Sequence, residues 1–98
     1  MNKSYYIYIL SSTNHSIFYT GVTNDLLRRT YGHKNKVVPG YTSKYNLNKL
    51  LYYEEYLDPE NAIAREKQVK KYSQVKKIKL IQKFNPGMID LYDGIINL

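Results

Sequence analysis

The sequence contains no cysteine, which excludes disulfide bonds, thiolate catalysis and the usual structural zinc sites. Only two histidines are present, so oxygen atoms would have to supply most ligands of any bound metal. Tryptophan is absent too, so the chain lacks an anchor typical of membrane-surface domains. Acidic residues are scarce, eight against fifteen Lys and Arg, which gives a net charge of +7. This excess favours a phosphate-rich partner, foremost nucleic acid, although lysine can also serve solubility alone.

The length of 98 residues supports one domain, expected to span residues 1–98, because two cores would each be too small to fold alone. The apolar fraction of 43% and the charged fraction of 23% are close to globular averages, which favours a folded, non-membrane protein. The N-terminal apolar run is short, rich in tyrosine and without a small-residue cleavage signal. We interpret it as a strand of a cytoplasmic protein.

Two β-branched and aromatic runs, residues 5–10 and 17–22, flank a polar stretch and predict a hairpin. A loop centred between positions 13 and 14 would set Tyr8 opposite Tyr19 on one face of the sheet. Residues 49–56 have the composition of a third strand. The expected fold class is α/β (α+β), with a small three-stranded antiparallel sheet flanked by helices.

Capping residues predict where three helices begin. Thr23, Asn24 and Asp25 supply capping side chains before a helical segment that starts near residue 25 and runs to about residue 35. Asp58, which is followed by proline, begins a helix to about residue 72, and Ser73 caps a last helix to about residue 84. Residues 37–48 lack a clear period and predict a loop with room for a short helical turn.

Positive charge is concentrated in the last two predicted helices, where Glu66 is the only acid between residues 65 and 83. Such a stripe suits a phosphate backbone, and it would make binding weaken steeply with salt. A solvated helix face is the alternative meaning of this pattern. The basic residues predicted to bind nucleic acid are Arg28, Arg65, Lys67, Lys70, Lys71, Lys76 and Lys77.

Glu66 is expected to point inward, because at 100° per residue it falls within an apolar stripe of its helix. The stripe consists of Ala62, Ile63 and Val69. A carboxylate that faces the sheet is costly unless a cation or a metal meets it. Glu66 is therefore either half of a partly buried ion pair or a metal ligand, and spacing alone favours an ion pair with Arg28 or Arg29.

Five positions follow one another in a distinctive order along the chain. Tyr6-Ile7-Tyr8 comes first and Tyr19-Thr20-Gly21 second, with ten residues between Tyr8 and Tyr19. Arg29 follows ten positions after Tyr19, and His33 four positions after that. Glu66 on a later helix completes the set. This order resembles that of GIY-YIG nucleases, in which the two tripeptides stand at the first and second family motifs.

The resemblance covers roughly residues 4–92 and is greatest to small bacterial single-domain members, relatives of the excision-repair nuclease domain and of homing endonucleases. Tyr6 replaces the glycine of the first motif, and Thr20 replaces the isoleucine of the second. Neither is expected to do chemistry. Asn85 matches a late family asparagine and joins the residues predicted to bind DNA.

The resemblance implies hydrolysis of a DNA phosphodiester with one divalent ion, Mg²⁺ or Mn²⁺, held by Glu66. Arg29 would bind the scissile phosphate, and Tyr19 would orient water or phosphate. Tyr8 would act as general base with His33 assisting, and the choice of base stays open between these two. A phenol has a pKa of about 10, so Tyr8 needs help worth about 4 kcal/mol, which Arg29 or the ion could supply.

A chain of this length leaves no room for a separate targeting domain. We therefore expect a DNA repair or processing enzyme that selects branched, single-stranded or damaged DNA, or that depends on a partner protein. One rival is a catalytically silent nucleic-acid-binding module, against which the complete set of five positions argues. A second rival, a protein-interaction or membrane-surface domain, has no supporting feature in the sequence.

Overall fold

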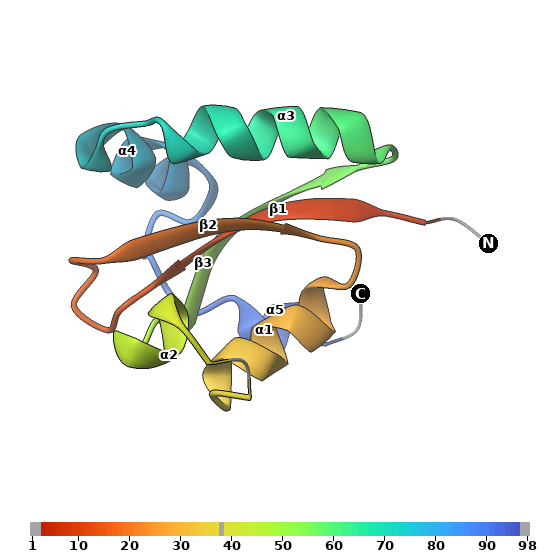
Figure 1. Cartoon of the computed structure of the whole chain (residues 1–98). Helices are drawn as coiled ribbons and strands as arrows, with labels where there is room; N and C mark the ends of the chain where they lie inside the picture. The colour runs from red at the N-terminus through yellow and green to blue at the C-terminus, as the bar shows by residue number, and fades with distance from the viewer. Residues whose placement is uncertain (1–2, 38, 97–98) are drawn as a thin grey trace.

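A computed structural model describes residues 3–37 and 39–96. Its centre is a three-stranded antiparallel sheet, as predicted, and the strand order is β2-β1-β3 (Figure 1). The strands are β1 (Tyr5–Ser11), β2 (Phe18–Thr23) and β3 (Lys49–Tyr56). Because β1 lies in the middle, β2 and β3 form the two edges of the sheet.

Helices cover both faces of the sheet. They are α1 (Leu26–Lys34), α2 (Tyr41–Lys44), α3 (Pro59–Lys70), α4 (Gln74–Phe84) and α5 (Tyr92–Ile95). In Figure 1, α3 and α4 lie on one side of the sheet, and α1, α2 and α5 lie on the other. The predicted caps Asp25, Asp58 and Ser73 each accept a hydrogen bond from a backbone N–H in the first turn of their helix. Helix α5 was not predicted.

The hairpin register differs from the prediction. Tyr8 pairs with Gly21, and Leu10 pairs with Tyr19, so the prediction that Tyr8 lies opposite Tyr19 is wrong. The turn is centred one residue later than expected, where His15 adopts a left-handed φ of 59°. A shift of two residues in pairing keeps side chains on the same face. Tyr8 and Tyr19 are therefore diagonal neighbours on one face of the sheet.

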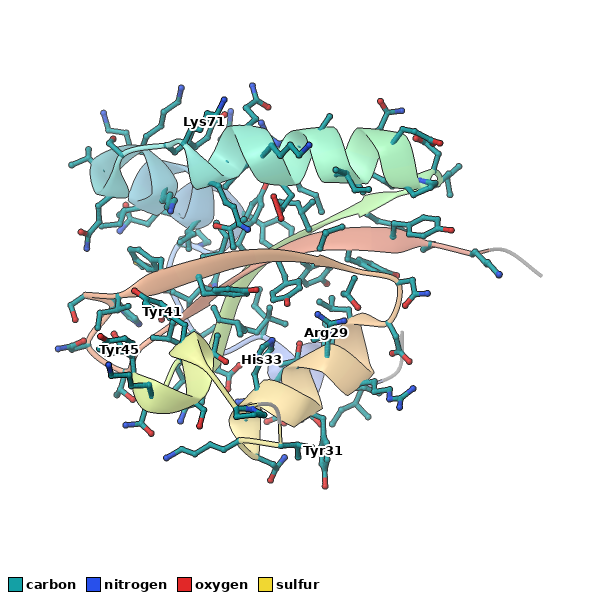
Figure 2. All side chains as sticks on the ribbon, in the orientation of Figure 1. Arg29, Tyr31, His33, Tyr41, Tyr45 and Lys71 are labelled. Atoms are coloured by element: carbon teal, nitrogen blue, oxygen red, sulfur yellow. The ribbon has the colours of Figure 1, made fainter. Side chains whose placement is uncertain are left out.

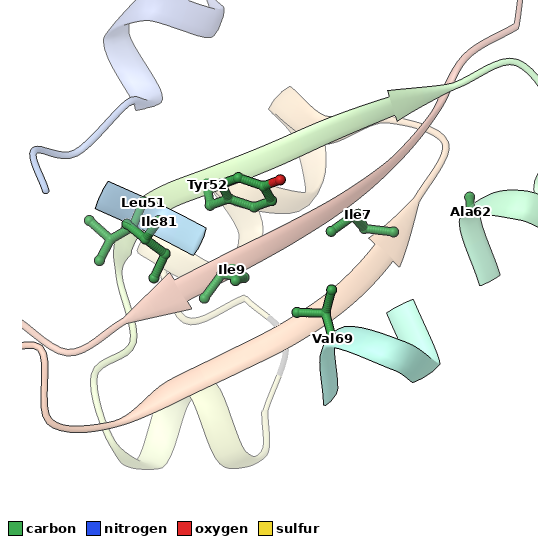
Figure 3. Close-up of a cluster of buried hydrophobic side chains, with 7 residues drawn as sticks. All are labelled: Ile7, Ile9, Leu51, Tyr52, Ala62, Val69 and Ile81. Atoms are coloured by element: carbon green, nitrogen blue, oxygen red, sulfur yellow. The ribbon is translucent and has the colours of Figure 1, made fainter. Parts of the chain in front are cut away.

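Two hydrophobic clusters hold the layers together. The first lies between the sheet and the α3–α4 layer and consists of Ile7, Ile9, Leu51, Tyr52, Ala62, Val69 and Ile81 (Figure 3). The second lies on the opposite face and consists of Tyr8, Leu10, Leu26, Leu47, Leu50 and Ile95. Alternate β1 residues thus enter different clusters, and this central strand is buried on both faces. Tyr8 belongs to the second cluster, on the side of the sheet that α1 covers.

Within residues 3–37 and 39–96, no helix combines the length and the apolar character that a bilayer crossing requires.

Candidate active site

Two tyrosines and a histidine meet on the α1 side of the sheet. Tyr8 comes from β1, Tyr19 from β2 and His33 from α1. The ring centroids are 6.3 Å apart for Tyr8 and Tyr19, 6.0 Å for Tyr8 and His33, and 5.9 Å for Tyr19 and His33. The Tyr8 hydroxyl lies 3.3 Å from His33 Nε2, within hydrogen-bonding distance. Residues far apart in the sequence therefore form one aromatic cluster.

Gly21 makes room for Tyr8. A Cβ atom at position 21 would lie 2.5 Å from Cζ and 2.9 Å from Cε1 of the Tyr8 ring, and would also collide with the hydroxyl oxygen. The Gly21 backbone is not in the left-handed region, so close approach is the reason for glycine here. The second sequence motif thus contributes a tyrosine and also the space that the first tyrosine occupies.

His33 is held from its other nitrogen by Thr42 of α2. Its Nδ1 lies 2.8 Å from Thr42 Oγ1, and both side chains are buried. If Nδ1 carries the proton and donates it to Thr42, then Nε2 is free to accept the Tyr8 hydroxyl proton. Burial, assisted by the positive charge of Arg29, lowers the pKa of His33 from its ordinary value of 6.5. The imidazole is therefore neutral at pH 7 and able to take a proton.

The Tyr8 pKa moves in the opposite direction from the expectation. Burial, with smaller contributions from the nearby Tyr19 and Glu66, raises the pKa of Tyr8 to about 12, although Arg29 acts to lower it. We expected the positive surroundings to dominate, but Tyr8 is fully buried and desolvation outweighs the guanidinium. Tyr8 alone therefore holds its proton at neutral pH.

Glu66 points inward, as predicted, with 14% of its side chain exposed. Its partner was predicted wrongly: the carboxylate lies 3.2 Å from Lys70 Nζ, one turn along α3, and not beside Arg28 or Arg29. Ile63 is 43% exposed and is not part of the inward stripe. Lys70 Nζ also lies 6.0 Å from the Tyr19 ring centroid, which locates the Glu66–Lys70 pair at the β2 edge.

Arg29 comes from α1, which lies on the other side of the sheet from α3, the helix that carries Glu66 (Figure 1). Arg28 and Arg29 are exposed and line a groove of about 470 Å³ beside α1. The other residues of the groove are Thr23, Asn24, Asp25, Tyr31, Gly32 and Val37. Figure 2 shows Arg29 and His33 on the same helix, beneath the sheet. The Arg29 charge affects both Tyr8 and His33, so the guanidinium belongs to the same site.

Glu66 is an isolated carboxylate in this site. Among the described residues, no three His, Cys, Asp or Glu side chains gather as a metal cage. A hard ion such as Mg²⁺ or Mn²⁺ fits this donor set, because it commonly binds one or two carboxylates and takes its remaining ligands from water and substrate phosphate. The Lys70 ammonium pairs with the Glu66 carboxylate, so a divalent ion would compete with Lys70 for this carboxylate.

Comparison with known proteins identifies the family of this chain. The family model described as "GIY-YIG catalytic domain" matches residues 4–79. The chain belongs to the GIY-YIG family. A UPF0213 protein of Clostridium perfringens is 37% identical to it over 76 residues, which cover 78% of this chain and 81% of that protein. A UPF0213 protein of Oceanobacillus iheyensis is 30% identical over 82 residues, which cover 84% and 94%.

A solved structure supports the fold of this GIY-YIG domain. The solution NMR structure of a UPF0213 protein from Bacillus halodurans matches with a TM-score of 0.51 at 30% sequence identity. The match covers 81% of this chain and 83% of that one. The predicted three-stranded sheet with flanking helices is therefore confirmed.

The predicted basic stripe of this GIY-YIG domain has two sides. Lys70 and Lys77 lie toward β2. Lys77 lines a hollow beside Phe18, and burial, together with the charge of Lys70, lowers the pKa of Lys77. Lys76 lies elsewhere, 4.1 Å from the Tyr72 ring centroid. Lys67 and Lys71 are exposed, and Figure 2 shows Lys71 on the outer side of the α3–α4 layer. The stripe is therefore not one continuous surface.

Arg65 was predicted to bind DNA, but its guanidinium is engaged within the fold. Arg65 Nε and Nη2 donate to the Glu54 carboxylate at 3.0 Å, and Nη1 donates to Tyr72 Oη at 3.1 Å. Tyr52 and Tyr56 donate to the same carboxylate. Burial would raise the pKa of Glu54, but these hydrogen bonds outweigh it and hold the pKa below 4.5. Arg65 completes a structural network at β3, away from the β2 edge.

Asn85 also has a structural role in place of the predicted contact with DNA. It is 5% exposed, and its Nδ2 donates to the carbonyl oxygens of Leu51 and Ile89 at 3.1 and 2.8 Å. Its Oδ1 accepts from the Ile89 N–H at 3.3 Å. Both side-chain N–H groups donate within the fold, one to β3 and one to the segment after α4, so neither remains for a phosphate.

Proposed function

We propose that this chain is a metal-dependent endonuclease that hydrolyses DNA phosphodiester bonds in the cytoplasm. The observation that carries the proposal is the meeting of Tyr8, Tyr19 and His33 on one sheet face, where the charges of Arg29 and Glu66 both act on Tyr8. Membership of the GIY-YIG family also supports a nuclease. The set supplies two phenols, an imidazole, a guanidinium and a carboxylate.

The proton path follows from the two pKa directions. A buried phenol with a raised pKa is a poor base alone, but it can accept a proton from water while passing its own to a neutral imidazole. His33 Nε2 is 3.3 Å from the Tyr8 hydroxyl and is neutral at pH 7. We propose that Tyr8 and His33 act as one relay, in which His33 is the final acceptor. This relay is our proposal for the choice of base that the sequence left open.

Charge stabilisation falls to Arg29 and Glu66. The Arg29 guanidinium would donate paired hydrogen bonds to the non-bridging oxygens of the scissile phosphate, where negative charge grows. Glu66 would hold Mg²⁺ or Mn²⁺, whose contribution when bound is Lewis-acid stabilisation of the leaving oxygen. Tyr19, half-buried beside Tyr8, would orient the attacking water or the phosphate.

The proposed DNA path runs along the β2 edge. Arg28 and Arg29 supply positive charge on the α1 side, and Lys70 and Lys77 supply it on the α3–α4 side. Lys67 and Lys71 are exposed and would contribute only to a larger substrate. Branched, single-stranded or damaged DNA, a role in repair or processing, and a targeting partner remain our proposals for selectivity.

One observation favours the alternative of a catalytically silent nucleic-acid-binding module. Tyr8 is fully buried, so a neighbouring side chain must shift before water reaches its hydroxyl. If no substrate causes this shift, the same surface would bind DNA without cutting it. The two functions therefore differ in cleavage and not in binding.

The test incubates the protein with single-stranded, duplex, flap and junction DNA in Mg²⁺, Mn²⁺ or EDTA. The variants are Glu66→Gln and, as a matched control on the same helix, Glu60→Gln, whose side chain is exposed. We expect cleavage only with metal, unchanged by E60Q and reduced about 100-fold or more by E66Q, since Lewis-acid assistance is worth several kcal/mol. Binding without cleavage in every condition would establish the silent module instead.

A further inference from the structure

Two exposed tyrosines on α2 are not explained by the core. Tyr41 is 51% exposed and Tyr45 is 38% exposed, and neither belongs to the two hydrophobic clusters. Their ring centroids are 4.8 Å apart with an angle of 55° between the planes. Lys44 Nζ lies 5.3 Å from the Tyr45 ring centroid. Exposed large aromatic side chains that gather beside a cation often mark a binding surface.

This pair is tied directly to the proposed active site. Thr42, the residue after Tyr41, carries the hydroxyl that holds His33 Nδ1 at 2.8 Å. Figure 2 shows Tyr41 and Tyr45 on α2, next to the helix that bears His33 and Arg29. A ligand that rests on α2 is therefore adjacent to the groups that would act on a phosphate.

A hollow beside Tyr41 continues the surface toward α4. It has a volume of about 210 Å³ and is lined by Ser16, Ile17, Phe18, Tyr41, Gln74 and Lys77. Gln74 Nε2 donates to the Ser16 carbonyl oxygen at 3.2 Å, which fixes the hairpin turn against α4. The hollow therefore combines an aromatic ring, apolar hairpin side chains and the ammonium group of Lys77.

An aromatic face beside positive charge matches the two parts of a nucleotide. A base can stack on tyrosine in a way that tolerates any sequence, while a lysine neutralises the adjoining phosphate. The bases of an intact duplex are already stacked on both faces, so only an unpaired base can use such a surface. Lys44 and Lys77 also make an acidic nucleic acid strand a better fit than a neutral or basic partner.

We infer that Tyr41 and Tyr45 form a stacking platform for an unpaired base of the DNA strand whose phosphate enters the cleft. The inference rests on the proposed function for the identity of that strand. The platform selects DNA that has at least one unpaired nucleotide beside the bound phosphate. Its position on α2 also links base capture to the residue that orients His33.

The test measures binding in EDTA, where metal-dependent cleavage cannot occur. A single-stranded oligonucleotide that contains 2-aminopurine is titrated with wild-type protein, the double variant Tyr41→Ala/Tyr45→Ala and the double variant Tyr41→Phe/Tyr45→Phe. Phe84→Ala is the matched control, because Phe84 is an aromatic residue that is 49% exposed but packs against Tyr52 and Tyr53 of β3, on a helix across the sheet from α2 (Figure 1). The thermal midpoint of each variant is measured to verify the fold, and all side chains changed are exposed.

We expect the alanine double variant to bind the oligonucleotide about 5- to 150-fold more weakly, with loss of 2-aminopurine quenching. The phenylalanine variant keeps both properties, because it retains the stacking faces, and F84A binds like the wild type. Duplex affinity is unchanged by the alanine variant. Equal affinity and quenching in the alanine variant, an equal loss in F84A, or an equal loss on duplex would each overturn the inference.

The binding assay separates this inference from the proposed function. A protein that quenches 2-aminopurine through Tyr41 and Tyr45 but never cuts DNA supports the platform and refutes the nuclease. A protein that cuts DNA with metal, but binds equally well without the two tyrosines, supports the nuclease and refutes the platform.

Discussion

Substitution of Gly21 by alanine tests the geometry of the site through a single methyl group. The new Cβ would lie 2.5 Å from Tyr8 Cζ, so the ring must move by roughly 1 Å to reach ordinary contact near 3.4 Å. Tyr8 is fully buried and cannot move into solvent. We expect a loss of about 1–3 kcal/mol from overpacking, partly offset by about 0.5–1 kcal/mol because glycine is unfavourable in a strand.

We expect G21A to lose most of its catalytic activity under conditions in which the protein remains folded. A displacement of roughly 1 Å separates the Tyr8 hydroxyl from His33 Nε2, and misplacement of this size can reduce a reaction rate about 100-fold. The assays are kcat/KM for DNA cleavage and the thermal midpoint, which should fall by several degrees for a domain of this size. Gly94→Ala on α5 is the control, since open space surrounds that position. Full activity of G21A, or an equal loss in G94A, would refute the reasoning.

Three further predictions concern pH, stability and charge. His33 must be neutral to accept the proton, and its pKa lies below 6.5. The value of kcat/KM should therefore stay level down to about pH 6.5 and fall only at lower pH. A fall in kcat/KM that begins above pH 6.5 would contradict the relay. Arg65→Ala should lower stability by about 1–3 kcal/mol, because the Glu54 carboxylate loses its partner, while DNA affinity measured on folded protein stays within about twofold. Lys77→Ala should reduce the slope of log affinity against log salt concentration by about 0.7–0.9. Lys76→Ala should leave this slope unchanged, because the Lys76 ammonium lies over the Tyr72 ring. Equal slopes for the two variants would disprove the two-sided stripe.

Local chemistry explains why most element boundaries could be predicted. Helix caps depend on a side chain and backbone groups within three residues, and Asp25, Asp58 and Ser73 all act as their residue types indicate. The hairpin register depended on the turn instead. His15 in a left-handed conformation moved the turn centre by one residue, and nothing in the alternation of the strands indicated this.

The residues of the candidate site could be predicted from the sequence, but their burial, contact partners and pKa shifts could not. The inward direction of Glu66 followed from helical periodicity, whereas its pairing with Lys70 and the exposure of Ile63 depend on where α3 meets the sheet edge. The raised pKa of Tyr8 reflects burial by residues distant in sequence. Thr42 lies in a segment without periodic pattern, so no sequence signal marked it as the partner of His33.

Asn85 and Arg65 illustrate the limit of reading charge and polarity along the chain. Both belong to residue types that bind nucleic acid, yet each satisfies a buried partner within the fold. Conversely, Gly21 offered a signal that was available in the sequence. A glycine inside a strand often marks a close approach of another group, and here that group is the Tyr8 ring.

A double-substitution cycle on kcat/KM for DNA cleavage examines most directly whether Arg29 and Glu66 serve one reaction centre. Arg29→Ala, Glu66→Gln and the combined variant are compared under identical metal and salt conditions. Residues that act as a unit show strongly non-additive effects, so the combined variant should lose little more activity than the worse single variant. Losses that multiply, or cleavage that survives both substitutions, would contradict a shared catalytic site at the β2 edge.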